Sequence, residues 1–497
     1  MWLTQLLERN RQCYPDRRAL VDERRSVTWS ELHDRTLRLA HGFARLGLRA
    51  GDRVAVLSLD RIEVLETYFA LARIGVLFVP LNHSLTTAEI GGIVERTGPA
   101  AIVGEGKLLG RHPDLPVRLR IALDGAEYAA LADGDGDGGA GAPGLPAVPD
   151  DALAAILHTS ATTGQAKGVT VDHASFRAIA LGWLALARPE DDMVLVNCCP
   201  LYHGSVVVSL TYLAAGATVV LMPGFKPQTA LAAIEENRAT HVWLVPQMLR
   251  FILRAGARQG TDLSSLREIL YGAAPMPVDV YGEALEELGC GFRQVYGMTE
   301  VGGPFVTLGP EEHPPLDRIP DIIPSGRVIP GMSARVLDTR GGEAGPGEIG
   351  EIGVRGPGVM RGYWGNDEAT AEITVDGWTL TGDLGFIDRD GRIHLVDRSK
   401  DLIIRAGQNV YPTEIERALR SHPGVADVAV VGVPDEDYGE VPLAYVVADG
   451  EVGAAELLRH AAGLLAPYKR PRRVEFIEQV PRNPAGKIVK KLLRTAG

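Results

Sequence analysis

The sequence predicts an α/β fold, with a large N-terminal domain of several subdomains and a small α+β C-terminal domain. Three observations predict it. The chain has 497 residues, too many for one ordinary domain. Strand-like apolar runs alternate with helical periodicity as far as about residue 221, which is typical of a doubly wound α/β body. From about Gly347 the pattern changes to short strand-like runs separated by glycines.

The first elements show this alternation. Thr28–Glu31 has the spacing of a capping box and begins a predicted helix, for which Gly47 is a suitable C-terminal cap. A buried strand is predicted over 54–57, a second helix over 62–74 and a further strand over 76–79.

A segment rich in glycine and aspartate, 132–149, cannot form a core and predicts an exposed loop. The next segment, Leu157–Gly168, is the most informative of the chain. It places four hydroxyl side chains, one glycine and one lysine within nine residues, between the strand-like runs 153–157 and 169–171.

Hydroxyls and backbone N–H groups in such a turn can donate to phosphate oxygens, and Lys167 adds positive charge. The segment is not a Walker A loop, because Lys167 is followed by Gly168 and two residues separate it from Gly164. We interpret it as a phosphate-binding loop; a Ser/Thr-rich surface loop is the alternative.

Composition excludes several classes of protein. The net charge of −12 is spread along the chain, which argues against a nucleic-acid partner. The four cysteines are too few and too irregularly placed for a disulfide framework or a zinc site, and the adjacent Cys198 and Cys199 are expected to be buried thiols. Met1–Arg11 is charged where a signal peptide is apolar, and no apolar run approaches 18 residues. A cytoplasmic enzyme without an integral membrane segment is expected.

The C-terminal part begins with predicted strands at 348–355, 384–388 and 391–396. A charged stretch, 397–401, follows, and beyond it the pattern indicates a compact α+β unit with elements at 414–419, 425–433, 443–447 and 454–465. We place a domain boundary at Lys400, on the change of pattern.

Three further clusters carry chemically useful side chains. Tyr296–Glu300 puts a hydroxyl beside a carboxylate, a pair suited to a phosphate oxygen and Mg²⁺. Thr381–Asp383 has a carboxylate after a glycine, suited to a ribose diol, and Pro481–Lys487 places a lysine after a turn rich in proline and glycine. Singly, each is equally well explained as a helix cap, a β-turn or a solvated lysine.

Together, these clusters resemble the motifs of the adenylate-forming superfamily, which comprises acyl-CoA synthetases, adenylation domains and firefly-type luciferases; acid–CoA ligases are the most similar. The resemblance runs from about residue 5 to 495 in the family's motif order. It implies an ATP- and acid-binding domain, 1–399, and a small mobile domain, 400–497, that carries the catalytic lysine. A carboxylate would first attack the α-phosphate of ATP, giving acyl-AMP and pyrophosphate, and the thiol of CoA would then take the acyl group.

The resemblance also assigns the nucleotide site. The residues that would hold the β- and γ-phosphates are Thr159, Ser160, Thr162, Thr163, Gly164 and Lys167. The residues that would sandwich adenine are Gly272, Ala273, Ala274, Pro275 and Tyr296. Asp383 and Arg398 would hold the ribose hydroxyls.

Three residues would act on the reacting groups. Thr299 would contact the α-phosphate and Glu300 would hold Mg²⁺. Lys487 would stabilise the charge that develops on the carboxylate and the α-phosphate.

The remaining roles concern CoA and domain motion. Lys400 stands at the family's hinge position, and Gly407 matches a glycine that leaves room for the pantetheine arm. The candidate CoA contacts are Tyr438, Tyr468, Arg470 and Arg472. Lys469–Arg473 is equally well explained as a solvated basic turn.

Three departures from the family's pattern bear on activity. In the phosphate loop, Ala161 replaces a glycine and Ala166 replaces a proline, which predicts altered binding of pyrophosphate. Ala406 replaces a glycine beside the predicted thiol tunnel, and its methyl group is expected to weaken thioester formation.

His203 bears on the acid, because amino-acid-activating relatives use an aspartate near this point to pair the substrate ammonium. A histidine favours an acid without an α-amine; a buried, hydrogen-bonded histidine is the alternative. The expected pocket walls are Val206, Trp243, Gly272, Gly297, Met298 and Gly302. Glycines there are expected to leave space for a bulky aryl, alicyclic or medium-chain acid.

The sequence thus predicts an acid–CoA ligase that uses ATP and Mg²⁺. An enzyme that loads a carrier protein, or one that only adenylates, is the first alternative, and a catalytically silent nucleotide-binding protein is the second. The oligomeric state stays open.

Overall fold

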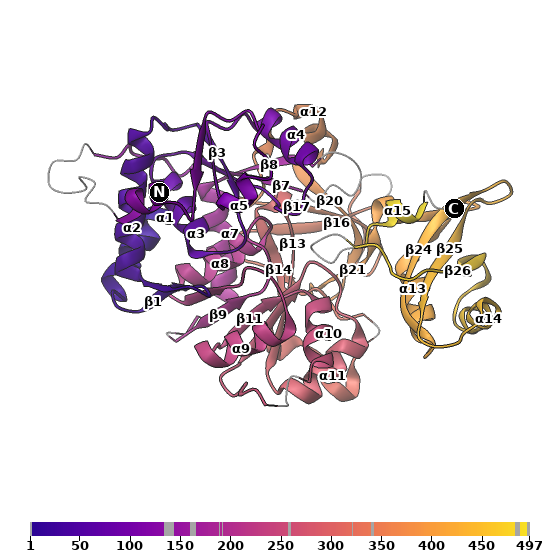
Figure 1. Cartoon of the computed structure of the whole chain (residues 1–497). Helices are drawn as coiled ribbons and strands as arrows, with labels where there is room; N and C mark the ends of the chain where they lie inside the picture. Colours follow the sequence, from indigo (N-terminus) through magenta and orange to yellow (C-terminus); the bar gives the residue numbers. More distant parts are fainter. Residues whose placement is uncertain are drawn as a thin grey trace. The chain divides into compact units, whose positions relative to one another are not determined.

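The computed structural model describes residues 2–133, 144–159, 166–187, 189–190, 192–256, 260–320, 322–338, 342–482 and 488–494. The described residues form two compact units: one contains the residues up to 159 together with 166–333 and 354–379, and the other contains 334–353 and the residues from 380 onward. The predicted α/β fold with a second, α+β part is confirmed (Figure 1). The boundary at Lys400 lies within the second unit and stays a prediction.

Two sheets form the first unit. Sheet A contains, in spatial order, β15 (Arg327–Val328), β14 (Gly303–Leu308), β13 (Gly291–Met298), β12 (Glu268–Gly272), β11 (His241–Leu244), β9 (Val194–Asn197), β10 (Thr218–Leu221), β1 (Arg18–Val21) and β2 (Ser26–Thr28). Sheet B contains β18 (Gly362–Tyr363), β8 (Gly168–Asp172), β7 (Leu153–His158), β4 (Leu77–Pro80), β3 (Arg53–Leu57), β5 (Ala101–Gly104) and β6 (Leu119–Ala122).

The centre of sheet A is parallel. Strands β9 to β12 are short and mostly apolar, and β13 is longer and includes the buried Arg293 and Gln294. Most side chains of these strands are buried on both faces, as parallel strands require. The register pairs Trp243 with Leu270 and Gly272 with Val295. The carboxyl ends of β11, β12 and β13 therefore meet at one edge of the sheet.

Helices cover the sheets of the first unit. They are α1 (Trp2–Cys13), α2 (Trp29–Arg45), α3 (Ile62–Arg73), α4 (Thr87–Thr97), α5 (Gly106–Leu109), α6 (Ala126–Asp133), α7 (His173–Ala187), α8 (Ser205–Ala214), α9 (Pro227–Asn237), α10 (Pro246–Arg254), α11 (Val278–Leu288) and α12 (Asp367–Glu372). Helix α7 contacts both β8 and β14 and so lies between the sheets, while α9, α10 and α11 pack on the other face of sheet A (Figure 1).

The predicted N-terminal elements are confirmed within one or two residues. Thr28 caps α2 by accepting the Glu31 N–H at 3.2 Å, and the Glu31 carboxylate accepts the Thr28 N–H at 2.7 Å, which completes the capping box. Gly47 follows the helix with φ +89°. Cys198 and Cys199 are buried free thiols, as expected.

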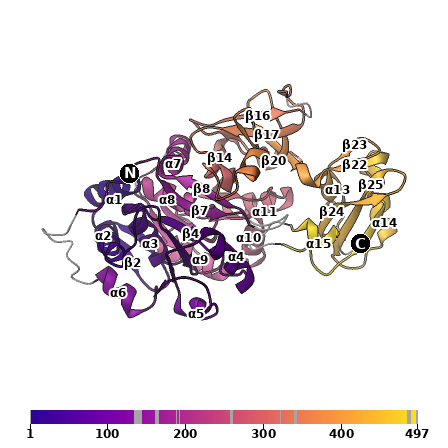
Figure 2. The same cartoon turned by 90° about the horizontal axis from the view of Figure 1, so that it is seen from above.

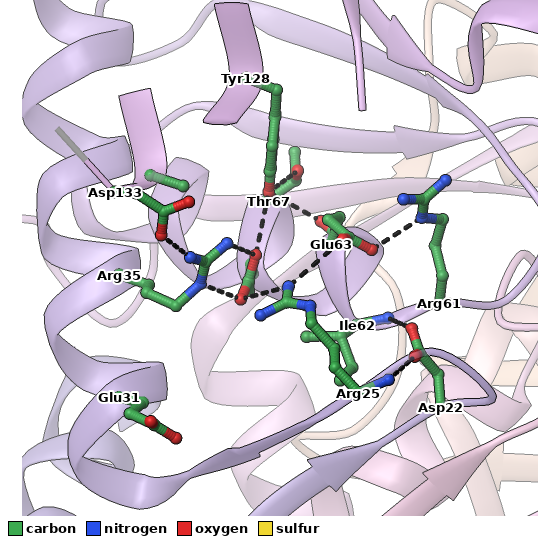
Figure 3. Close-up of polar contacts among 12 residues, drawn as sticks. Asp22, Arg25, Glu31, Arg35, Arg61, Ile62, Glu63, Thr67, Tyr128 and Asp133 are labelled. Atoms are coloured by element: carbon green, nitrogen blue, oxygen red, sulfur yellow. Dashed lines mark hydrogen bonds and ion pairs between the residues drawn. The ribbon is translucent and has the colours of Figure 1, made fainter. Parts of the chain in front are cut away.

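Helix α3 carries a buried cluster of charges (Figure 3). Glu63 pairs with Arg61 at 2.7 Å and with Arg25 at 3.2 Å, and the fully buried Glu66 pairs with Arg35 at 2.6 Å and with Arg25 at 3.0 Å. This α3 ion cluster joins α2 and the β1–β2 hairpin to α3. Because these charges are paired inside the unit, removal of one partner is expected to destabilise the packing of these elements.

The second unit holds most of sheet C and all of sheet D (Figure 2). Sheet C contains β16 (Ser333–Leu337), β17 (Gly350–Arg355), β20 (Trp378–Ile387), β19 (Thr374–Val375) and β21 (Ile393–Arg398). Sheet D contains β23 (Gln408–Val410), β22 (Ile403–Arg405), β25 (Gly439–Ala448), β24 (Val425–Asp435) and β26 (Arg473–Phe476), and its helices are α13 (Pro412–Arg420), α14 (Ala454–Leu464) and α15 (Lys490–Arg494).

The predicted strand at 384–388 is the end of the longer strand β20, which begins at Trp378. Gly382 and Asp383, in the middle of this strand, interrupt its apolar pattern, which is why the sequence pattern missed the residues before Leu384. In the part of the chain that the structure describes, no helix is long and apolar enough to cross a membrane.

Candidate functional site

Several predicted site residues gather at the carboxyl edge of sheet A. Trp243 lies on β11, Gly272 ends β12, and Tyr296 lies near the end of β13. Ligands of open α/β sheets bind at this edge. The structure thus brings together residues that the sequence places about 25 to 50 positions apart.

At Gly272, the last residue of β12, the main chain lies very close to the main chain of Val295. A Cβ on Gly272 would lie 2.4 Å from the Val295 carbonyl oxygen and 3.1 Å from Cη2 of Trp243, so only glycine fits. Ala273 then turns the chain with φ +65°, a conformation that is strained for a residue with a side chain. Ala273 and Pro275 are exposed and Ala274 is half-buried, so this segment presents a surface beside Tyr296.

The predicted phosphate loop connects the two strands of an antiparallel hairpin, β7 and β8. Its described ends are bonded to each other: the Thr159 N–H donates to the Lys167 carbonyl at 3.1 Å, and the Lys167 N–H donates to the Thr159 hydroxyl at 3.2 Å. Ser160, Ala161, Thr162, Thr163 and Gly164 lie outside the described residues. The confirmed part of this prediction is the pair of strands on either side.

Thr299 and Glu300 lie on the 3₁₀ turn η1 (Thr299–Val301), directly after β13. Both side chains are half-buried. The phenol of Tyr363 donates to Oε1 of Glu300 at 2.8 Å, and the Lys167 Nζ lies 4.8 Å from the centre of the Tyr363 ring. Burial, together with the neighbouring Glu300 charge, raises the pKa of Tyr363 and keeps its hydroxyl protonated.

The Glu300 environment fits Mg²⁺ delivered with a nucleotide. Among the described residues, no three acidic, histidine or cysteine side chains gather as a metal cage. A single carboxylate is consistent with Mg²⁺, which usually keeps several waters and completes its shell with substrate phosphates.

Sequence reasoning missed Tyr363. Its position depends on the pairing of β18 with β8, which joins Tyr363 to Val169 across almost two hundred residues. The local signal, the aromatic pair Tyr363–Trp364 between two glycines, is typical of any packed turn.

The prediction that Gly297 and Gly302 leave space for a bulky acid is wrong. A Cβ on Gly297 would lie 2.3 Å from the Gly303 carbonyl oxygen, and a Cβ on Gly302 would lie 2.8 Å from the Gly358 carbonyl oxygen. Main chain occupies the positions where side chains would stand. These glycines permit close packing of neighbouring segments and give no information on the size of the acid.

His203 lies in the turn before α8, next to Val206, which is 1% exposed. The His203 ring meets the Tyr202 ring edge to face at 4.6 Å between centres. The buried Asp60, which the sequence did not single out, fixes this turn: its two carboxylate oxygens accept the Leu201 N–H at 2.9 and 3.1 Å. Burial raises the pKa of Asp60 to about 8, so the group is mostly neutral at pH 7.

The raised pKa of Asp60 predicts a pH-dependent stability. A carboxyl with a pKa near 4 when unfolded and about 8 when folded binds a proton on folding, so the free energy of unfolding falls as pH rises between these values. We expect a fall on the order of 1 kcal/mol per pH unit between pH 5 and 7.5, and a flatter profile in Asp60→Asn. Urea unfolding followed by tryptophan fluorescence measures it.

The exposed Asp114 supplies the control, since Asp114→Asn should keep the wild-type profile. Equal slopes for the Asp60→Asn and wild-type proteins would show that Asp60 is ionised in the folded state.

In the second unit, the predicted ribose residues face each other. Asp383 on β20 is the antiparallel partner of Arg398 on β21, and the Arg398 Nε lies 3.0 Å from Oδ1 of Asp383. Gly382 has φ +70°, and its N–H donates to the Glu351 carboxylate at 3.1 Å. Lys400 is exposed on the 3₁₀ turn η4 (Ser399–Asp401), and its carbonyl accepts from Arg494 at 3.4 Å.

Three of the candidate CoA residues gather around Arg405. Ala406 and Gly407 form the two-residue turn between β22 and β23 with φ +49° and +78°, and the Ala406 N–H donates to the Tyr438 carbonyl at 2.8 Å. The Arg405 guanidinium stacks 4.8 Å from the Tyr438 ring centre and donates to the Tyr468 carbonyl at 2.9 Å. A turn with two positive φ values favours glycine at both positions, so Ala406 costs about 1 kcal/mol.

The two arginines of the CoA prediction differ. Arg470 donates to the carbonyls of Leu465 at 3.0 Å and Ala462 at 2.9 Å, which ties it to the C-terminal end of α14. Arg472 is exposed. Lys487 lies outside the described residues, and Arg482 and Ile488 on either side of 483–487 form an antiparallel bridge.

Comparisons with known proteins agree with this arrangement. The family model of the AMP-binding enzyme matches residues 7–364, and that of the AMP-binding enzyme C-terminal domain matches 414–487. The chain is 37% identical to the fatty acid–[acyl-carrier-protein] ligase ScoC of Streptomyces coeruleorubidus, over 99% of this chain and 96% of that protein. It is 37% identical to a feruloyl-CoA synthase of an Amycolatopsis species, over 94% of each chain. The crystal structure of ATP-bound MatB from Rhodopseudomonas palustris is similar with a TM-score of 0.90 at 32% identity, covering 99% of this chain and 98% of that one.

Proposed function

The chain belongs to the AMP-binding enzyme family, and from that premise we propose that it is an ATP-dependent acid–CoA ligase. In the first half-reaction, a carboxylate oxygen of the acid attacks the α-phosphorus of ATP and the bond to pyrophosphate breaks, leaving acyl-AMP. In the second, the thiol sulfur of CoA attacks the acyl carbon and AMP departs.

One observation carries the proposal best. Lys167, from the predicted phosphate loop, and Glu300, the predicted metal carboxylate, come from distant segments and meet on the same side chain, Tyr363. A positive and a negative group on one aromatic side chain, with Thr299 next to Glu300 on the turn η1, suit a triphosphate with its metal ion. When bound, Mg²⁺ would neutralise phosphate charge, held by Glu300.

The other residues have positioning roles in this proposal. Tyr296 and the segment Gly272–Pro275 would hold adenine, Asp383 with Arg398 would hold the ribose, and Lys487 would stabilise the charge that develops during adenylation. Lys400 would be the hinge between the two half-reactions. Gly407, Tyr438 and Tyr468 would border the path of the thiol, with Arg472 at its exposed end.

The environment of His203 supports an acid without an α-amine. The carboxyl group near this turn, Asp60, is occupied by the Leu201 N–H, and its raised pKa of about 8 leaves it mostly neutral at pH 7. It is therefore a poor partner for an ammonium group. Feruloyl-CoA synthase, whose name gives an aromatic acid, is among the relatives, so we propose an aryl acid as the first class to test.

A carrier protein is a second candidate for the acyl acceptor, because the chain is 37% identical both to the carrier-protein ligase ScoC and to the feruloyl-CoA synthase. An enzyme of this kind would pass the acyl group to the phosphopantetheine thiol of a carrier protein. Both acceptors present a phosphopantetheine thiol, so the methyl group of Ala406 beside Gly407 would weaken thioester formation with either of them and favours an enzyme that only adenylates.

The test is the exchange of labelled pyrophosphate into ATP across a panel of carboxylic acids. We expect exchange that requires Mg²⁺ and an acid, with aryl acids more active than acetate and than amino acids. CoA or a phosphopantetheinyl carrier protein is then added, and the thioester is identified by mass. Failure of every acid to support exchange would contradict the proposal, and thioester on the carrier alone would select the alternative acceptor.

A further inference from the structure

Tyr363 is held rigidly from two sides. Its strand, β18, pairs with β8, which leaves the predicted phosphate loop, and the Thr170 hydroxyl donates to the Gly362 carbonyl at 2.7 Å. On the other side, the Tyr363 N–H donates to the Thr370 hydroxyl at 2.9 Å. The side chain is 6% exposed, so packing fixes its direction.

The segment before Tyr363 runs beside the turn that carries Glu300. The Met360 N–H donates to the Glu300 carbonyl at 2.9 Å, and Arg361 is ion-paired with the fully buried Asp172. Gly302 approaches the Gly358 carbonyl so closely that no Cβ would fit. The main chains of Glu300 and Tyr363 are thereby held at a fixed separation.

The hydroxyl and the ring of Tyr363 contact two different charged groups. The hydroxyl donates to one oxygen of the Glu300 carboxylate at 2.8 Å and leaves the second oxygen for another partner. The ring lies under the Lys167 ammonium, whose Nζ is 4.8 Å from the ring centre, within the range of a cation–π contact.

We propose that Tyr363 is a positioning residue that aligns the metal carboxylate with the phosphate-loop lysine. Its hydroxyl orients Glu300 so that the second carboxylate oxygen would be available to Mg²⁺, and its ring holds Lys167, which would contact the triphosphate. This inference rests on the proposed function, because it assigns Mg²⁺–ATP to the site.

Two variants separate the two contacts. Tyr363→Phe keeps the ring under Lys167 and removes the hydrogen bond to Glu300, whereas Tyr363→Leu removes both. Tyr281→Phe is the matched control: Tyr281 is 1% exposed, and its hydroxyl donates to the Pro314 carbonyl at 2.8 Å, elsewhere in the first unit. Circular dichroism and thermal unfolding establish that each variant is folded.

The measurement is equilibrium binding of ATP by calorimetry, with excess Mg²⁺ and with EDTA, at equal ionic strength. In Tyr363→Phe we expect the affinity with Mg²⁺ to fall about tenfold and the affinity in EDTA to stay within twofold, because a hydrogen bond to a charged group is lost. In Tyr363→Leu the affinity in EDTA should also fall, by about threefold, as the cation–π contact is lost. Tyr281→Phe should match the wild type in both buffers.

The inference is overturned if Tyr363→Phe gains as much affinity from Mg²⁺ as the wild type, or loses affinity equally with and without Mg²⁺. Acid-dependent pyrophosphate exchange in the wild type together with either result would leave the proposed function standing. A wild-type protein that binds no ATP in either buffer would overturn both.

Discussion

Replacing Lys487 by alanine is expected to abolish adenylation while sparing the second half-reaction. The lysine would stabilise charge on the carboxylate and the α-phosphate only during the attack on ATP, and removal of one such group costs about a hundredfold to a thousandfold in rate. Pyrophosphate exchange measures the first step. Formation of thioester from synthetic acyl-AMP and CoA measures the second, and we expect it to change by less than about threefold.

Lys491→Ala is a suitable control, because Lys491 is an exposed lysine on α15 of the same unit. It should leave both half-reactions close to the wild type. Equal losses of both steps in Lys487→Ala would contradict a role confined to adenylation and would indicate damage to the C-terminal unit as a whole.

The largest expected loss of stability comes from Glu66→Ala in the α3 ion cluster. The Glu66 carboxylate is fully buried and accepts from Arg35 Nε at 2.6 Å, from Arg35 Nη2 at 3.1 Å and from Arg25 Nη2 at 3.0 Å. Its removal takes away the buried carboxylate that pairs with both guanidinium groups and leaves Arg25 with Glu63 and Arg35 with the exposed Asp133. Because the cluster loses its most buried partner, we expect about 3 kcal/mol of destabilisation. Guanidinium chloride unfolding followed by far-UV circular dichroism measures it.

A surface ion pair gives the matched comparison. Asp192 pairs with Arg267, and their side chains are 64% and 43% exposed, so Asp192→Ala should cost less than about 1 kcal/mol. A cost for Glu66→Ala as small as that for Asp192→Ala would show that water replaces the lost partner, against the burial seen here.

Local signals were enough to predict the elements that depend on neighbouring residues. The Thr28–Glu31 capping box predicted α2, because its two hydrogen bonds join residues three positions apart. Likewise, apolar runs on both sides of 159–167 predicted β7 and β8. The order of motifs along the chain predicted the family, which the comparisons bear out.

Features that depend on distant segments were missed or misjudged. Tyr363 reaches Glu300 only because β18 pairs with β8, and Asp60 is buried against a turn that follows β9, far along the chain. From the sequence, Gly297 and Gly302 were expected to leave space in the acid pocket. In the fold, the main chain of residues 303 and 358 occupies the positions where their side chains would stand. Neither kind of contact leaves a local pattern.

The parallel pairing of β1 with β10 also bears on the order in which the chain folds during synthesis. Leu20 lies opposite Val219, so the β1–β2 hairpin leaves the ribosome long before its partner strand exists. Until residue 221 emerges, the hairpin presents an uncovered edge, the kind of surface through which nascent chains associate wrongly. The β1–β2 hairpin, one of the first segments to be synthesised, can therefore pair with the rest of sheet A only after β10 has been translated.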